Sequence, residues 1–282
     1  MIAITGASGY VGGLAREEFA ADGALRLVRR PTRGNDIGWD FAMPAQALVT
    51  KLTDKRVTHI VHAAWDMRSS RLDELKQTAV AGSMRLLEAA GETGAKVIFI
   101  STISAFTGAR SAYGKAKLEV EEAVTRSGGI VLRLGLVAGE GGMFGSLRKA
   151  IRGSRFVPMI GNGSTPQYLL PQASLQQALR AAVDGKLDNE RGPVTLALPR
   201  AVPFKSLLRA LAREAGRHVT LVPVPWQIFY TAFRGAELCG LKTGFRSDSV
   251  LSFIYQDRDP DFGPQARLGL TPAWDALPLA LD

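Results

Sequence analysis

The chain has 282 residues, 46% of them hydrophobic, and a formal net charge of +9 at pH 7. This length supports one large core with a smaller appended lobe, and since no apolar run approaches the roughly 18 residues that span a bilayer, we expect no transmembrane segment. One cysteine excludes an internal disulfide, His59, His62 and His218 lack the spacing of a metal site, and dispersed basic residues without interleaved aromatics argue against nucleic-acid binding.

The sequence opens directly on a strand and a turn rather than on a secretion signal, so we expect the protein in the cytoplasm. Short apolar strands then alternate with amphipathic helices through the first half of the chain. This alternation predicts βαβ units and an α/β, doubly wound parallel sheet of the Rossmann type. The predicted strands are 2–5, 24–28, 57–62, 96–101 and 130–134, and the predicted helices are 10–21, 72–90 and 111–125.

Glycine clusters after Gly135 mark the expected start of a smaller substrate lobe. A helix at 174–183 and an apolar run at 194–198 predict a return to the main sheet. We therefore expect a discontinuous C-terminal lobe, with the Rossmann domain formed by 1–135 and 171–198 and the substrate lobe by 136–170 and 199–282.

Two segments of this lobe have competing interpretations. The aromatic run 226–233 could be core, a lid over an apolar substrate or an interfacial contact, and we favour core. The basic side chains of Arg148, Arg152 and Arg155 fall on one helix face, which favours a solvated face over a binding site for a nucleotide diphosphate. Arg246 is another candidate for that role.

The loop after the first strand has the pattern G-x-x-G-x-x-G. Gly6 permits a tight turn, Gly9 lets the backbone approach a pyrophosphate, and Gly12 lets the following helix lie close to the strand. The helix N-terminus offers N–H groups to phosphates. The loop therefore predicts a dinucleotide cofactor, contacted by Gly6, Ser8, Gly9, Tyr10, Val11 and Gly12.

The end of the second strand bears on which dinucleotide binds. An acid there would bind the ribose 2′-hydroxyl of NAD, whereas an arginine accommodates the 2′-phosphate of NADP. The sequence has Arg29 and Arg30 there and no acid, so NADP is favoured over NAD. If both arginines are merely solvated, NAD stays acceptable. Asp40 and Phe41, after a third strand, are expected at the adenine edge.

Tyr113 and Lys117 lie one helical turn apart on the predicted helix 111–125. A lysine cation near the phenol, together with the oxidised nicotinamide, favours phenolate, which would lower the tyrosine pKa and let Tyr113 exchange a proton with a carbonyl or alcohol. Upstream, the strand 96–101 ends beside two hydroxyls that could orient the reacting oxygen. Thr102 is the first candidate and Ser104 the second.

These motifs, together with Val61–Ala64, Ser101–Thr102 and Leu132–Gly135, resemble the extended short-chain dehydrogenase/reductase family, specifically its NAD-dependent epimerase/dehydratase group. The resemblance implies that Thr102, Tyr113 and Lys117 form a catalytic triad, that Lys117 also holds the nicotinamide ribose, and that Ala63 and Ala64 pass the nicotinamide side of the cofactor. It also implies nucleotide-sugar substrates and a homodimer formed through the helices 72–90 and 111–125. The short segment between Thr102 and Tyr113 implies a more open site than is usual in the family.

We therefore expect an NADP-preferring oxidoreductase that reduces a keto group on a nucleotide sugar, with Tyr113 as the general acid. Three alternatives stay open at this point. They are a nucleotide-sugar 4-epimerase, a ketoreductase for a non-sugar substrate, and a non-catalytic NADP-binding sensor. Each takes a small molecule as its ligand, and none needs a metal or a nucleic acid.

Overall fold

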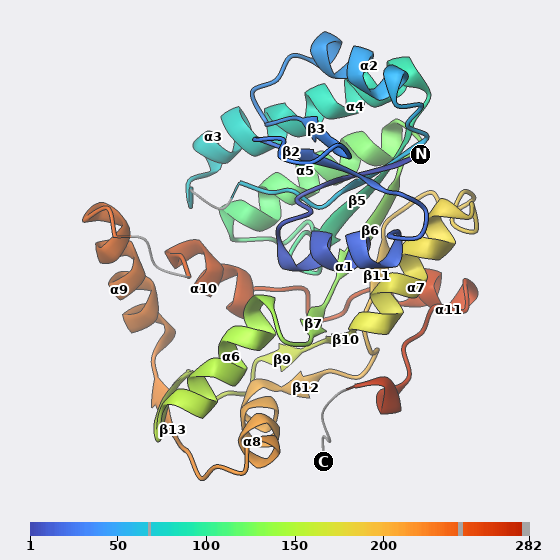
Figure 1. Cartoon of the computed structure of the whole chain (residues 1–282). Coiled ribbons are helices and arrows are strands. Elements are labelled where there is room, and N and C mark those ends of the chain that lie inside the picture. The colour runs from blue at the N-terminus through green and yellow to red at the C-terminus, as the bar shows by residue number, and fades with distance from the viewer. Residues whose placement is uncertain (67–68, 242–244, 278–282) are drawn as a thin grey trace.

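A seven-stranded parallel sheet forms the centre of the computed structural model, which describes residues 1–66, 69–241 and 245–277 (Figure 1). The strand order is β11-β6-β5-β4-β1-β2-β3. All six pairings are parallel. The predicted α/β doubly wound fold is therefore confirmed. The strands are β1 Ile2–Thr5, β2 Leu25–Val28, β3 Asp36–Gly38, β4 His59–His62, β5 Lys96–Thr102, β6 Ile130–Leu134 and β11 Val194–Leu196.

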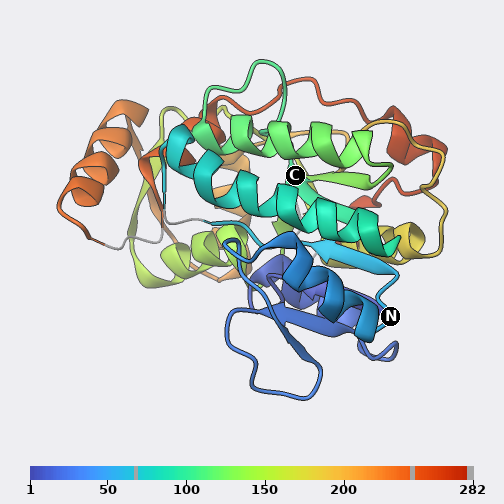
Figure 2. The same cartoon turned by 90° about the horizontal axis from the view of Figure 1, so that it is seen from above.

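Helices cover both faces of this sheet. One face carries α1 and α7, and the other carries α2, α4 and α5, which lie side by side in Figure 2. Alternating side chains of β5 serve the two faces, since Ile98 and Ile100 enter the core under α1 and α7, whereas Phe99 packs under α5. The helices are α1 Tyr10–Glu18, α2 Ala45–Asp54, α4 Ala81–Thr93, α5 Ala112–Arg126 and α7 Gln172–Val183.

The helix predicted over 72–90 is interrupted. It starts as α3 (Leu72–Leu75), passes through a π-helical turn, η1 (Lys76–Val80), and continues as α4. A Cβ at Gly82 would overlap the ring of Phe41, so glycine lets the segment after β3 pack tightly against α4. Sequence periodicity does not reveal a π turn, because one extra residue shifts the apolar face by only part of a turn.

A second lobe is built around its own core, below the sheet in Figure 1. Phe144, Leu207 and Leu208 are fully buried there. Its helices are α6 Gly142–Gly153, α8 Phe204–Glu214, α9 Trp226–Leu238 and α10 Ser247–Ile254. Its paired strands are β7 Leu136–Ala138 with β10 Leu169–Pro171, β8 Phe156–Ile160 with β13 Thr220–Val224, and β9 Pro166–Gln167 with β12 Val202–Pro203. Residues 242–244 and 278–282 of the expected substrate lobe lie outside the described residues.

The end of the described chain returns to the main sheet. The helix α11 (Gly263–Arg267) packs against β11, and the short turn η2 (Trp274–Ala276) follows it. The Gln265 side chain accepts a hydrogen bond from the backbone N–H of Ala197 at 3.3 Å and donates one to its carbonyl at 2.9 Å. Part of the segment expected in the substrate lobe therefore supports the edge of the sheet.

Two predictions for the second lobe are wrong. Arg148 is only 5% exposed rather than solvated, because it pairs with Glu140 and, at 2.6 Å, with Glu214. Arg152 and Arg155 are exposed, as expected. The run 226–233 is not core, since α9 has no buried residue and projects from the body in Figure 1.

Candidate active site

The glycine loop lies at the carboxyl end of β1. Gly6 adopts a left-handed conformation with φ +66°, and its carbonyl accepts the N–H of Gly9 at 2.8 Å. A Cβ on Gly12 would overlap that same carbonyl, so α1 can approach β1 this closely only with glycine there.

The open face of this loop fits a dinucleotide. Ser8 and Gly9 are exposed, and Gly9 begins α1 without a side-chain cap, which leaves the first N–H groups of the helix facing outward. Val11 packs against the core. The Tyr10 side chain turns away to pack on Gly141, and its hydroxyl accepts a hydrogen bond from Gln172 at 2.6 Å, so only the backbone of Tyr10 borders the loop.

The second and third strands end at the same edge as the glycine loop, since β2 pairs with β1 and with β3 in parallel. Arg29 and Arg30 directly follow β2 and are exposed, and within the described parts of the chain neither forms an ion pair. Asp40 follows β3 and accepts the N–H of Ala42 at 2.9 Å, and Phe41 packs edge-on against Trp39.

Ala63 and Ala64 continue from β4 and lie against the glycine loop. A Cβ on Gly6 would come within 2.7 Å of the Ala64 nitrogen. The Ala64 N–H donates at 3.0 Å to the hydroxyl of Thr5, at the end of β1. The structure therefore brings the predicted pyrophosphate loop and the predicted nicotinamide segment together.

A buried histidine joins this region to α4. His62 Nδ1 and Nε2 lie 2.8 Å from the hydroxyls of Thr5 and Ser83. Because Ser83 donates to the carbonyl of Ala79 at 2.7 Å, its oxygen accepts from Nε2–H, and Nδ1 accepts from Thr5. Burial, with a smaller contribution from the charge of Lys117, lowers the pKa of His62 to about 3. His62 is therefore a neutral, fixed connector, a role that the sequence around it does not predict.

Tyr113 and Lys117 lie on the inner face of α5, as predicted, but the nearest contacts of the lysine ammonium are with other groups than the phenol. Its Nζ donates to the carbonyl of Ile100 at 2.7 Å and lies 4.1 Å from the ring centre of Trp65 and 4.4 Å from that of Phe99. The distance to the ring centre of Tyr113 is 5.9 Å.

The pKa values of this pair follow from burial. Burial raises the pKa of Tyr113 to about 12, and the charge of Glu121 adds to this. The expected lowering of the tyrosine pKa includes the charge of an oxidised nicotinamide and stays a prediction for the cofactor complex. Burial also lowers the pKa of Lys117 to about 7, against the opposing effect of Glu121. A desolvated phenol keeps its proton, which suits it to donate rather than to accept one.

Glu121 lies one helical turn beyond Lys117, on the same face of α5. Its carboxylate accepts from the Ser101 hydroxyl and from the Arg133 guanidinium, the closest contact to the latter being 2.6 Å. Burial raises the pKa of Glu121, and the hydrogen bond and charge of Arg133 oppose this. The spacing of 113, 117 and 121 puts all three on one helix face, so this residue could have been found from the sequence.

Thr102 and Tyr113 both line a cavity of about 240 Å³ between the sheet and the second lobe. Thr102 Oγ1 accepts the N–H of Ser104 at 3.2 Å, whereas the Ser104 hydroxyl donates to the carbonyl of Ser252 at 3.2 Å. Ser104 is thus bonded to α10. The second lobe contributes Gln167, Arg246, Asp248, Ser249, Ser252, Phe253 and Gln256 to the lining.

No group of histidine, cysteine and acidic side chains in residues 1–66, 69–241 and 245–277 is placed to hold a metal ion. Over the same ranges, no helix has the length and apolar character needed to cross a bilayer.

The model of the NAD dependent epimerase/dehydratase family matches residues 2–165. No curated protein sequence matches the chain. Solved structures with the same fold include a UDP-glucose 4-epimerase with UDP-glucose from Thermotoga maritima, at 18% identity over 95% of this chain and 92% of the other, with a TM-score of 0.70. A dTDP-4-dehydrorhamnose reductase from Clostridium acetobutylicum is 17% identical over 90% and 97% of the chains, with a TM-score of 0.67. A UDP-N-acetylglucosamine 4-epimerase from Bacillus cereus is 18% identical over 90% and 94%, with a TM-score of 0.66.

Proposed function

Because this chain belongs to the NAD dependent epimerase/dehydratase family, and so is an enzyme of the extended short-chain dehydrogenase/reductase type, we propose that it reduces a keto group on a nucleotide sugar with NADPH. The observation that supports this most directly is the shared cavity of Thr102 and Tyr113, at the same sheet edge as the open glycine loop. In a doubly wound fold this edge is where ligands bind.

The proposal includes a set of cofactor contacts. The loop backbone of Gly6, Ser8, Gly9, Tyr10, Val11 and Gly12 would hold the pyrophosphate. Arg29 and Arg30, exposed after β2, would hold the 2′-phosphate, with Asp40 and Phe41 at the adenine. Ala63, Ala64, Tyr113 and Lys117 would border the nicotinamide and its ribose. When bound, NADPH supplies the hydride.

Tyr113 is the general acid in this proposal. Its raised pKa of about 12 keeps the proton on the phenol until a carbonyl oxygen develops negative charge. Thr102, in the same cavity, would hold that oxygen by a hydrogen bond from its hydroxyl. Lys117, charged below about pH 7 in the protein alone, would stabilise the phenolate that remains after transfer.

The nucleotide sugar would lie in the cavity toward the second lobe. Arg246 supplies a cation to the cavity wall, and Gln167 and Gln256 supply amides that can bind sugar hydroxyls. Residues 136–170 and 199–282 would then form the substrate lobe, and 1–135 with 171–198 the cofactor domain. We further place the protein in the cytoplasm as a homodimer joined through α4 and α5, for which light scattering should give twice the 30.2 kDa of one chain.

The test is titration with NADPH and NADH by fluorescence, followed by a screen of UDP- and dTDP-linked keto sugars for loss of nicotinamide absorbance. Tighter binding of NADPH and its oxidation by one sugar would support the proposal. Interconversion of 4-epimers without net oxidation would instead identify a 4-epimerase. Oxidation only by non-sugar ketones would identify another ketoreductase, and NADPH binding with no turnover a sensor.

Tyr113→Phe separates catalysis from binding. We expect turnover to fall by roughly 10²- to 10⁴-fold, the contribution typical of a general acid, with NADPH affinity nearly unchanged. Tyr230→Phe, on α9, is the matched control and should keep full activity. Survival of activity in Tyr113→Phe would refute the assigned acid.

A further inference from the structure

The N-terminus of α5 is held by a carboxylate from the second lobe. Asp248, on α10, accepts the N–H of Ala112 through Oδ1 and the N–H of Tyr113 through Oδ2, both at 2.8 Å. Ser111 supplies the ordinary cap, since its hydroxyl accepts the N–H of Gly114 at 3.0 Å. Two of the N–H groups that a helix start leaves unpaired therefore depend on a residue more than 130 positions away in sequence.

This contact is buried and electrostatically favourable. Asp248 is 7% exposed, and its negative charge faces the positive end of the α5 dipole. Burial raises the pKa of Asp248, while the N–H groups of Tyr113 and Ala112 oppose that rise. Loss of the carboxylate would leave two desolvated N–H donors without acceptors.

The same helix α10 borders the cavity of the candidate active site. Ser249, Ser252 and Phe253 line the cavity together with Asp248, so α10 forms one wall of the site and also holds the start of the helix that carries Tyr113. A second link joins α10 to the end of β5, where the Ser104 hydroxyl donates to the carbonyl of Ser252.

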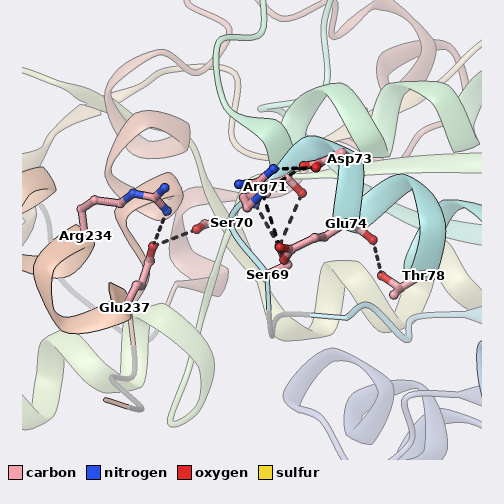
Figure 3. Close-up of polar contacts among 8 residues, drawn as sticks. All are labelled: Ser69, Ser70, Arg71, Asp73, Glu74, Thr78, Arg234 and Glu237. Atoms are coloured by element: carbon pink, nitrogen blue, oxygen red, sulfur yellow. Dashed lines mark hydrogen bonds and ion pairs between the residues drawn. The ribbon is translucent and has the colours of Figure 1, made fainter. Parts of the chain in front are cut away.

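The beginning of α10 is itself tied to the main domain through α9. Glu237 accepts the N–H of Ser247 at 2.8 Å and the hydroxyl of Ser70, in the segment after β4, also at 2.8 Å. Figure 3 shows this bond to Ser70 next to the ion pair of Glu237 with Arg234. In the same view Arg71, next to Ser70, pairs with Asp73 at the surface. At the start of α10, Ser247 is therefore bonded to α9 and Asp248 to α5.

We propose that Asp248 is a positioning residue for catalysis, which holds the backbone of Tyr113 from the substrate lobe so that the phenol faces the substrate enclosed by α10. This inference rests on the proposed role of Tyr113 as general acid. It makes correct placement of the acid depend on docking of the substrate lobe, although Asp248 need not touch the reacting atoms.

The test compares Asp248→Asn with a matched control, Asp261→Asn. Asp261 is exposed and accepts the N–H of Gly263, at the start of α11, so the control removes a carboxylate from another helix start that has no link to α5. An asparagine side chain has one acceptor oxygen instead of two, so one N–H of α5 loses its partner. We expect kcat to fall by about tenfold or more in Asp248→Asn, with the Kd for NADPH within about twofold of wild type.

Hydrogen exchange tests the contact between Asp248 and α5 without any substrate. The amides of Ala112 and Tyr113 should exchange at least about tenfold faster in Asp248→Asn than in the control. Unchanged exchange would overturn the proposal, whether or not the protein reduces a sugar. Faster exchange with unchanged kcat would also overturn it. If wild type turns over no sugar, the proposed function fails, and exchange alone decides whether Asp248 holds this helix. If Asp248→Asn does not fold, Asp248→Ser, whose hydroxyl can accept one N–H, replaces it.

Discussion

Lys117 occupies a place where a charge is costly. Its ammonium is enclosed by the rings of Trp65 and Phe99 and is 3% exposed, and its one hydrogen bond within the described chain goes to the carbonyl of Ile100. The aromatic faces offset part of the lost hydration, but not all of it, and the pKa therefore falls. A lysine in this environment gains from a further hydrogen-bond partner. A ribose hydroxyl placed nearer the phenol could be that partner.

Replacing Lys117 with Met should change how stability depends on pH. In wild type the pKa of Lys117 is about 7, against 10.5 for an ordinary lysine, so between these values the unfolded chain binds a proton that the folded protein does not. The free energy of unfolding should then rise with pH by up to about 1.4 kcal/mol per pH unit from this residue. Below about pH 7, Lys117 is protonated in both the folded and the unfolded chain, so it no longer makes the free energy of unfolding depend on pH.

Urea denaturation at pH 7, 8 and 9 measures the slope. Lys117→Met should lose it, whereas Lys115→Met, at an exposed position on the same helix, should keep it. Equal slopes in the two variants would show that Lys117 keeps an ordinary pKa.

Arg29→Asp tests cofactor choice at the end of β2. The exposed guanidinium is free to bind a 2′-phosphate in a bidentate manner, and an aspartate would repel that phosphate but could accept a ribose hydroxyl. We expect the Kd for NADPH to rise by about tenfold or more, and that for NADH to change by less than about threefold. Fluorescence titration with both dinucleotides decides, and equal losses would contradict the assignment of Arg29.

At the level of the elements, the first turn of α1 offers a paired test of close packing. A Cβ on Gly12 would overlap the Gly6 carbonyl, whereas a Cβ on Gly13 would meet open space. Gly12→Ala should therefore lower the free energy of unfolding by about 1–3 kcal/mol and weaken dinucleotide binding. Gly13→Ala should raise it by about 0.5–1 kcal/mol, because alanine favours the helix.

Thermal unfolding and NADPH titration of both variants provide the measurement. If the two alanines have the same effect, the loop does not require glycine at position 12, and the fit of α1 against β1 is looser than described.

The elements differ in how far sequence predicts them. Six strands of the main sheet were predictable because each is a short apolar run bounded by turn residues, whereas β3, with the sequence Asp-Ile-Gly, has no such pattern. The two-residue strands β9 and β12 were not, since their pairing depends on residues far apart in the chain. The helix α9 reads as core by its aromatic content, yet the core of the second lobe is completed by other elements, among them α8.

The residues of the candidate site also differ in how far the sequence predicts them. The glycine loop, Tyr113 and Lys117 follow from local spacing, and the structure places them at one sheet edge. The partners that fix them do not follow from local spacing. Asp248 meets α5 only after the second lobe has packed, and the sequence around it has no feature that would predict this contact. His62 is likewise identified as a connector only by the two hydroxyls that meet its ring.

At the scale of the whole molecule, the positive charge is unevenly distributed. In the stretches 142–164 and 199–241 of the second lobe, Glu214 and Glu237 are the only acidic residues, and both are paired with arginines. The whole lobe, residues 136–170 and 199–282, holds 14 of the 35 basic and 9 of the 26 acidic residues, so it contributes +5 of the net charge of +9. An anionic substrate would be attracted from a distance of about one Debye length, roughly 10 Å at 0.1 M salt.

For a nucleotide sugar, kcat/KM should therefore fall by about three- to tenfold as ionic strength rises from roughly 10 to 150 mM, while kcat stays constant. Steady-state kinetics across a series of NaCl concentrations measures this. A neutral ketone reduced by the same enzyme would show no such decline, and is the control. A flat profile for the nucleotide sugar would mean that the charge of the lobe does not guide its approach.

The single cysteine has a practical consequence. Cys239 is exposed and ends α9, the helix whose Glu237 reaches across to Ser70 of the main domain. A maleimide fluorophore would attach there at one known position without any prior mutagenesis. Because the label would lie close to the contact that joins the two lobes, its emission and anisotropy would report in real time on whether that contact opens and closes as ligands come and go.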